Sequence, residues 1–166
     1  MPFGRLPVIV FFTCLCLLVP LVSMAQEAVF IIRHTEQAVD GEDPPLTDIG
    51  HQRAARLPSV LRDAGIRVIY TSETLRTIQT AQPLAKTLAI DSRIVPRREI
   101  EALVRRLAAD HTQDRVLIVS HSQTIPVLLK ALGHTAEVPI GRDEYGSVFL
   151  VLPRQGMPPV VVRFHF

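Results

Sequence analysis

Two arginines and two histidines stand at places in the sequence where a phosphate-binding site could form. Arg33 and His34 come directly after the apolar run Ala28–Ile32, and His121 follows the apolar run "RVLIVS". Arg76 lies one turn into a segment of helical periodicity that follows another such run. Guanidinium is a planar, permanently charged fork that binds phosphate oxygens in pairs, and neutral imidazole is a competent nucleophile. Together these side chains could bind a phosphoryl group and attack it.

The elements that must position these side chains alternate between short β-branched runs and longer segments of helical periodicity. Strands are predicted at Ala28–Ile32, Arg67–Thr71, Arg93–Val95 and Arg115–Ser120, and in the C-terminal stretches "SVFLVLP" and "PVVVRFHF". Helices are predicted from Thr47 to Ala64, from Ser72 to Leu88, at Arg98–Ala109 and at Thr124–Leu132. This alternation favours an α/β fold, a three-layer α/β/α sandwich with a mostly parallel central sheet.

Local signals indicate where several of these elements begin and end. Ser72 is a favourable N-cap for the second helix, because its hydroxyl can accept a hydrogen bond from a backbone N–H of the first turn. Gly65 and Gly133 follow two of the helices and are typical helix-ending residues. Prolines in the last two strands favour positions near a sheet edge.

The carboxyl ends of the predicted strands bear the polar side chains. Ligands of open α/β sheets bind beyond these strand ends, where helix N-termini also point. We therefore expect Arg33 and His34 to meet Arg76 and His121 at one rim of the sheet. Each charge-assisted hydrogen bond from an arginine would contribute on the order of 1.5–3 kcal/mol to oxyanion binding.

Residues 1–25 have the features of a signal peptide. Arg5 precedes the apolar run Leu6–Val22, which is followed by the small-x-small triplet "SMA" that signal peptidase accepts. Cleavage after Ala25 would leave one domain at residues 26–166, in the periplasm or secreted. An uncleaved membrane anchor is the alternative, and it would be the domain's only contact with the membrane.

Composition argues against several classes of function. Cys14 and Cys16 both lie in the N-terminal segment, so the exported domain would have no thiolate nucleophile, disulfide or cysteine zinc site. The formal net charge is +2 and no basic run is interleaved with aromatic residues, which argues against a nucleic-acid partner. A zinc site of His34, His51 and His121 would lack a close His-x-x-x-His pair and a clear carboxylate, so we expect no metal.

Four segments contain these polar residues in a fixed order: "RHTE", "PPLTDIGHQRA", "TSETLRTIQTA" and "VLIVSHSQTIP". Together they resemble the ordered signatures of the histidine phosphatase superfamily, the group similar to phosphoglycerate mutase. The resemblance implies a phosphoglycerate mutase-like fold, in which the mostly parallel sheet includes an antiparallel strand. It also implies that His34 takes the phosphoryl group as phosphohistidine. Arg33, Arg76 and His121 would then bind the phosphate, and no cofactor would be needed.

The general acid of this family has no clear counterpart in the sequence. Larger members have a glutamate within a Glu/Gly-rich stretch that this chain lacks, and we expect Glu99 and Glu101 to lie on a solvated helix face. Glu36, in the loop beside His34, is the candidate acid. The alternatives in the same loop are Asp40, Glu42 and Asp43. A missing general acid costs about 10²–10⁴-fold in rate, so substrates with good leaving groups would be favoured.

Two functions are compatible with these residues. The first is an exported, metal-independent phosphatase that hydrolyses phosphomonoesters, small or surface-linked, through a phosphohistidine on His34. The second is a non-catalytic module that binds a phosphate ligand or a partner in a retained pocket. The joint presence of two arginines and two histidines favours the enzyme, and the unassigned acid favours the module.

Overall fold

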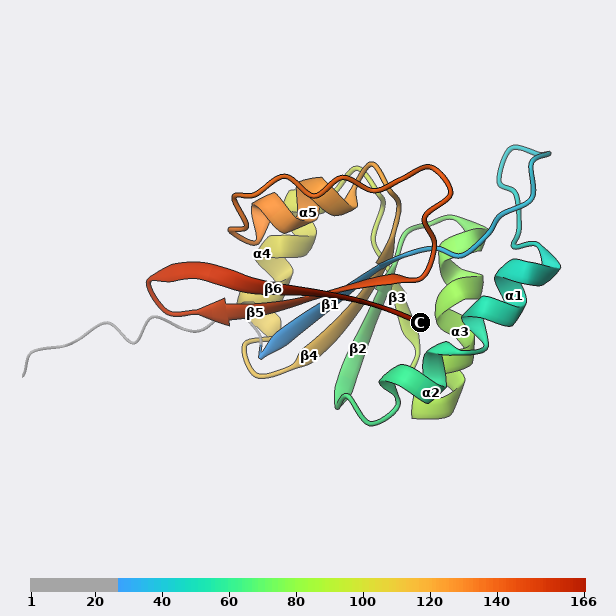
Figure 1. Cartoon of the computed structure of the whole chain (residues 1–166). Coiled ribbons are helices and arrows are strands. Elements are labelled where there is room, and N and C mark those ends of the chain that lie inside the picture. The colour runs from blue at the N-terminus through green and yellow to red at the C-terminus, as the bar shows by residue number, and fades with distance from the viewer. Residues whose placement is uncertain (1–26) are drawn as a thin grey trace, which may run out of the picture.

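The computed structural model describes residues 27–166, in which one six-stranded sheet lies between two layers of helices (Figure 1). The strands are β1 (Ala28–Arg33), β2 (Ile66–Thr71), β3 (Ser92–Ile94), β4 (Arg115–Ser120), β5 (Ser147–Arg154) and β6 (Met157–His165). The helices are α1 (Asp48–Ala54), α2 (Leu57–Leu61), α3 (Leu75–Leu88), α4 (Ile100–Asp110) and α5 (Ile125–Ala131). The predicted signal peptide lies outside the described residues.

The strands follow the order β3-β2-β4-β1-β5-β6 across the sheet. The pairs β3·β2, β2·β4 and β4·β1 are parallel, whereas β5 runs antiparallel to both of its neighbours, β1 and β6. This arrangement confirms the predicted fold class, a mostly parallel sheet with an antiparallel strand. Because β5 is reversed, its amino end lies at the same rim as the carboxyl ends of β1 and β4.

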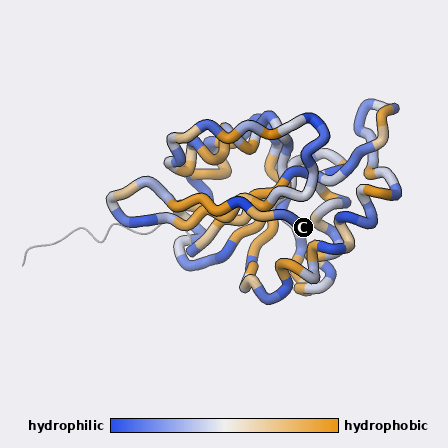
Figure 2. Tube along the Cα trace, viewed as in Figure 1, coloured by the Kyte–Doolittle hydropathy of each residue, from blue (hydrophilic) through white to orange (hydrophobic). Residues whose placement is uncertain are grey.

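Both faces of the sheet are buried, which explains why its central strands are apolar throughout instead of alternating. On one face, Val29 and Ile31 of β1 pack in a core with α4 and α5. On the other face, Phe30 and Ile32 pack in a second core with α2 and α3. Figure 2 shows the hydrophobic residues concentrated along the strands. The central strands are therefore a rigid platform for the residues at their ends.

The helix predicted from Thr47 to Ala64 is wrong as one element, because the structure has two short helices there. Thr47, where the predicted helix begins, is the N-cap of α1, and its hydroxyl accepts a hydrogen bond from Gly50 N–H. Pro58 lies in the first turn of α2, where a proline is tolerated. Its ring would clash with the carbonyl of Ala54 in a continuous helix, so the chain breaks between the two helices.

Ser72 is not the N-cap of the second predicted helix, which is a further correction. The N-cap of α3 is Thr74, and its side chain makes no capping hydrogen bond. The Oγ atom of Ser72 instead lies 2.9 Å from Nε2 of His121. A serine expected to stabilise a helix end thus contacts one of the predicted site residues. The other predicted elements differ from the structure by only a residue or two at their ends.

Candidate active site

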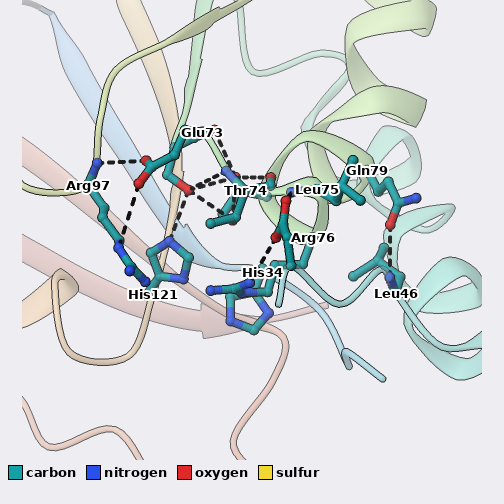
Figure 3. A network of polar contacts seen from close by, with 12 residues as sticks. His34, Leu46, Glu73, Thr74, Leu75, Arg76, Gln79, Arg97 and His121 are labelled. Atoms are coloured by element: carbon teal, nitrogen blue, oxygen red, sulfur yellow. Dashed lines mark hydrogen bonds and ion pairs between the residues drawn. The ribbon is translucent and has the colours of Figure 1, made fainter. Parts of the chain in front are cut away.

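The four predicted site residues lie together at one rim of the sheet. Parallel pairing places Arg33 of β1 opposite Ser120 of β4, so the histidines that follow these strands become neighbours. The ring centroids of His34 and His121 are 5.2 Å apart in an edge-to-face arrangement. Arg33 and Arg76 line the same open cavity as both histidines, and its volume is about 1020 Å³. Figure 3 shows His34 and His121 with Arg76.

His34 has the tautomer and charge state that a nucleophile needs. Its Nδ1 atom lies 2.8 Å from the carbonyl oxygen of Thr35, and because a carbonyl can only accept, Nδ1 must bear the hydrogen. Nε2 therefore has a lone pair. Burial lowers the pKa of His34 to about 4, and the positive charges of Arg76 and Arg33 also lower it. The ring is consequently neutral at physiological pH and able to attack phosphorus.

His121 is fixed by a cluster of hydroxyl groups. Its Nε2 atom contacts Ser72 Oγ, which also lies 2.9 Å from Oγ1 of Thr77 and 3.0 Å from Oγ1 of Thr74. Within residues 27–166, its Nδ1 atom has no hydrogen-bond partner and is available to a ligand. Burial lowers the pKa of His121 to about 3, with His34 and Arg76 as further causes.

Arg33 is anchored by one nitrogen and has donors to spare. Its Nη1 atom donates to the carbonyl oxygens of Gly141 (3.2 Å), Arg142 (2.7 Å) and Glu144 (3.1 Å). Its Cζ atom lies 4.0 Å from the ring centroid of Tyr145, a cation–π contact. Arg33 thus fixes the segment that leads into β5 as one wall of the cavity.

Two arginines that line the cavity each have a buried Nε atom without a protein partner. Among the buried side-chain nitrogen and oxygen atoms of residues 27–166, Nε of Arg33 and Nε of Arg76 are two of three that make no hydrogen bond. Leaving a buried donor unpaired costs about 1–3 kcal/mol, more for a charged group. Both guanidinium groups are thus incompletely paired by the protein, which favours an anionic ligand in the cavity that they line.

The N-terminus of α3 is not open to a ligand, contrary to the expectation from the sequence. The carboxylate of Asp43 accepts a hydrogen bond from the backbone N–H of Leu75, at 2.9 Å. The same carboxylate contacts Nη1 of Arg76 at 3.3 Å. Asp43 therefore occupies the helix end and orients Arg76, so anion binding depends on the side chains instead of this helix terminus.

Glu36, the candidate acid, does not lie in the cavity. Its carboxylate forms a two-pronged contact with Arg53, with Oε1 2.8 Å from Nε and 2.6 Å from Nη2. Burial alone would raise the pKa of Glu36, but the hydrogen bonds from Arg53 outweigh this and hold the pKa below its usual value. A paired carboxylate that stays ionised cannot donate a proton. The assignment of Glu36 as the general acid is therefore corrected.

The structure adds residues that sequence reasoning missed. Asp143 is the only carboxylate that lines the cavity in the described part of the chain, and Tyr145 lies beside it. The ring centroid of Tyr145 is 6.2 Å from that of His34. Both precede β5, and they reach the rim only because this strand is antiparallel. The signal in the sequence was "DEYG" before a strand, which became informative only once the direction of that strand was known.

The described residues show no arrangement suited to a metal ion. No group of three or more His, Cys, Asp or Glu side chains in residues 27–166 is placed to hold one. His51, which would complete a zinc site with His34 and His121, lies exposed on α1. In the same part of the chain, no helix combines the length and apolar character needed to cross a membrane.

Comparisons with known proteins concern the family and the fold. A family model described as histidine phosphatase superfamily (branch 1) matches residues 29–101, which include Arg33, His34 and Arg76 but not His121. A comparison with curated proteins gives no match.

Solved structures resemble the chain over nearly their whole length. The protein histidine phosphatase SixA, complexed with tungstate, has a TM-score of 0.68 and 20% identity over 83% of this chain and 96% of its own. The putative phosphohistidine phosphatase SixA from Agrobacterium tumefaciens has a TM-score of 0.65 and 18% identity over 84% of this chain and 99% of its own. A mycobacterial glucosyl-3-phosphoglycerate phosphatase, complexed with VO3, has a TM-score of 0.69 and 14% identity over 84% of this chain and 98% of its own. At these identities the likeness concerns the fold.

Proposed function

We propose that this chain, whose residues 29–101 match the histidine phosphatase superfamily model, hydrolyses phosphomonoesters through a phosphohistidine on His34, without a metal ion. One observation supports this most directly. Arg33 and Arg76 line the same cavity as His34, a neutral histidine whose Nδ1 contacts a carbonyl oxygen and whose Nε2 therefore has the lone pair. The tungstate and VO3 complexes of similar proteins are consistent with a fold that binds tetrahedral or vanadate oxyanions.

The first chemical step transfers the phosphoryl group to the protein. The dianionic ester docks between Arg33 and Arg76, with His121 as a further contact. Nε2 of His34 forms a bond to phosphorus while the ester P–O bond breaks, and the leaving alkoxide takes a proton from solvent water. The arginines stabilise the negative charge on the equatorial oxygens in the transition state. In the second step water attacks phosphorus while the P–N bond breaks; the products are hydrogen phosphate and neutral His34, and the remaining proton passes to solvent.

We also propose that the domain works outside the cytoplasm. The charged start, apolar run and "SMA" triplet of residues 1–25 support export to the periplasm or beyond. Its substrates would then be phosphoesters found there, either small molecules or groups linked to the cell surface. Edman sequencing of the protein recovered from the periplasm tests this, with Gln26 expected as the first residue.

Covalent labelling tests the phosphatase. The domain should hydrolyse p-nitrophenyl phosphate without added metal, be unaffected by EDTA and be inhibited by vanadate. Brief incubation with a ³²P-labelled phosphomonoester should give an acid-labile, base-stable label on His34 that is absent in His34→Ala. Label that persists in the variant would assign the nucleophile elsewhere, and no turnover with either this ester or phosphohistidine would refute the enzyme.

A non-catalytic phosphate-binding module is the second candidate. The observation in its favour is that Asp143, the one carboxylate lining the cavity in residues 27–166, is exposed to solvent, so no buried general acid faces the reacting centre. Binding of vanadate or phosphate by calorimetry without any turnover would identify the module.

A further inference from the structure

The cavity has more arginines than a phosphoryl group needs. They come from both of its walls: Arg33, Arg76, Arg97, Arg98 and Arg142. The single carboxylate among its lining residues is Asp143. At about 1020 Å³, the cavity also has room for a ligand much larger than phosphate, since sites for whole small molecules measure about 300–1,000 Å³.

Three of these arginines already have a partner or a role. Arg33 and Arg76 are the proposed phosphate ligands and line the cavity with both histidines. The charge of Arg97 is balanced by Glu73, whose Oε1 atom lies 3.6 Å from Nε of Arg97. The Oε2 atom of Glu73 also accepts a 2.9 Å hydrogen bond from the backbone N–H of Arg97. Figure 3 shows this Glu73–Arg97 pair close to His121.

Arg98 and Arg142 are left without a counter-charge. Neither forms an ion pair within residues 27–166. Residues 1–26 contain no aspartate or glutamate that could supply one. Their charge faces a cavity, where field lines concentrate and attract anions. Both side chains are exposed to solvent, so they can reach the part of a ligand that extends beyond the phosphoryl group.

The backbone fixes both arginines relative to the histidines. Arg98 follows Arg97, whose backbone N–H is bound to Glu73 in the loop after β2. The carbonyl oxygen of Arg142 is bound by Arg33 at 2.7 Å. In the strand order, the β3 side and the β5 side flank the reacting centre at β4 and β1. The backbones of the two arginines therefore lie on opposite sides of the strand ends that bear the histidines.

We propose that the natural substrate is a phosphomonoester whose leaving group bears a second anionic group, and that Arg98 and Arg142 bind this group. The inference rests on the proposed phosphatase and narrows its substrate class. A phosphate or carboxylate on the leaving group provides the acceptor oxygens that arginine prefers. Sugar bisphosphates are simple probes of this class.

The test compares two substrates that differ by one anionic group. The value of kcat/KM is measured for glucose 1,6-bisphosphate and for glucose 6-phosphate by phosphate release. In the wild type the bisphosphate should be favoured about tenfold or more, which corresponds to one charge-assisted contact. In Arg98→Ala/Arg142→Ala this preference should fall to about twofold, the statistical factor for two phosphates. Arg62→Ala/Arg154→Ala removes two arginines that do not line the cavity and should retain the full preference.

The outcomes separate this inference from the proposed function. If the wild type turns over both sugars equally well, or if both double variants lose the preference equally, the inference is wrong while the phosphatase remains. If there is no turnover at all, the phosphatase is wrong, and calorimetry with the same two ligands decides the inference. Tighter binding of the bisphosphate that is lost only in Arg98→Ala/Arg142→Ala would support it, and equal binding of the two ligands would refute it.

Discussion

The carboxylate of Asp43 orients the guanidinium of Arg76, with 3.3 Å between Oδ1 and Nη1. It also accepts the N–H of Leu75 at the start of α3. A loop residue far from Arg76 in sequence thus fixes both the helix end and a predicted phosphate ligand. Because the pair is partly exposed, its Coulomb energy contributes little to stability, and its main effect is to hold the Arg76 side chain in place.

Asp43→Ala should weaken substrate binding more than it slows chemistry. Without the carboxylate, Arg76 loses its fixed orientation and the first turn of α3 loses a cap worth about 1 kcal/mol. We expect KM for p-nitrophenyl phosphate to rise about threefold to tenfold with a smaller change in kcat. Steady-state kinetics check this, with Glu42→Ala in the same loop as the matched control. Equal kinetics for the two variants would show that Asp43 does not position Arg76.

The buried neutral histidines should make stability depend on pH. In the folded state the pKa values of His34 and His121 are about 4 and 3, whereas an unfolded histidine titrates near 6.5. As pH falls below about 6.5, the unfolded chain takes up protons that the folded chain does not, so the free energy of unfolding decreases. Each histidine contributes a slope of up to about 1.4 kcal/mol per pH unit until its folded pKa is reached.

Urea unfolding between pH 7 and 4 measures this slope. Carboxylates also titrate near the acid end, so the informative quantity is the difference between the wild type and His34→Gln/His121→Gln. The variant should lose less stability on acidification. Parallel curves would mean that the two histidines are protonated as readily in the folded chain as in the unfolded one.

Gly50→Ala should destabilise the fold although it replaces a helical glycine. Alanine in a helix is favoured over glycine by about 1 kcal/mol. A Cβ atom at Gly50, however, would lie 2.2 Å from the carbonyl oxygen of Glu36, and this contact is with backbone. Overpacking of this kind costs about 1–3 kcal/mol, so we expect a net loss in thermal or urea unfolding. Ile49→Ala, at an exposed position of the same helix, is the control and should be close to neutral.

Activity of Gly50→Ala would fall as well, because Gly50 is linked to the catalytic strand end. Its carbonyl accepts a 2.9 Å hydrogen bond from Oγ1 of Thr35, the residue after His34. A variant as stable as the wild type would show that α1 can move away from Glu36 without strain.

Glu36→Gln should retain turnover. Because Glu36 is paired with Arg53 outside the cavity, the substitution should lower stability without removing a proton donor. We expect the rates with p-nitrophenyl phosphate and with phenyl phosphate, a poorer leaving group, to fall by the same factor, about threefold or less. A selective loss with phenyl phosphate would restore Glu36 as the acid, because a general acid matters most for poor leaving groups.

The residues that the sequence placed correctly are those fixed by local position. Arg33, His34 and His121 come directly after buried strands, and the parallel sheet had only one rim at which such ends could meet. The errors concern partners distant in sequence. Nothing near Glu36 indicates that Arg53 would neutralise it, and nothing near Asp143 indicates that β5 would be reversed. The prediction of a single first helix was wrong for a local reason. The helical spacing of its apolar residues favoured one continuous helix, although Pro58 near its centre argues against one.

The contact between Arg33 and residues 141–144 has a consequence for engineering. Arg33 binds this segment entirely through backbone carbonyls, which every amino acid supplies. The side chains at positions 142 and 143 can therefore be exchanged without loosening the segment from the catalytic strand. A library randomised at these two positions would alter the cavity wall on a fixed scaffold, which makes them a favourable starting point for directed evolution toward new substrates.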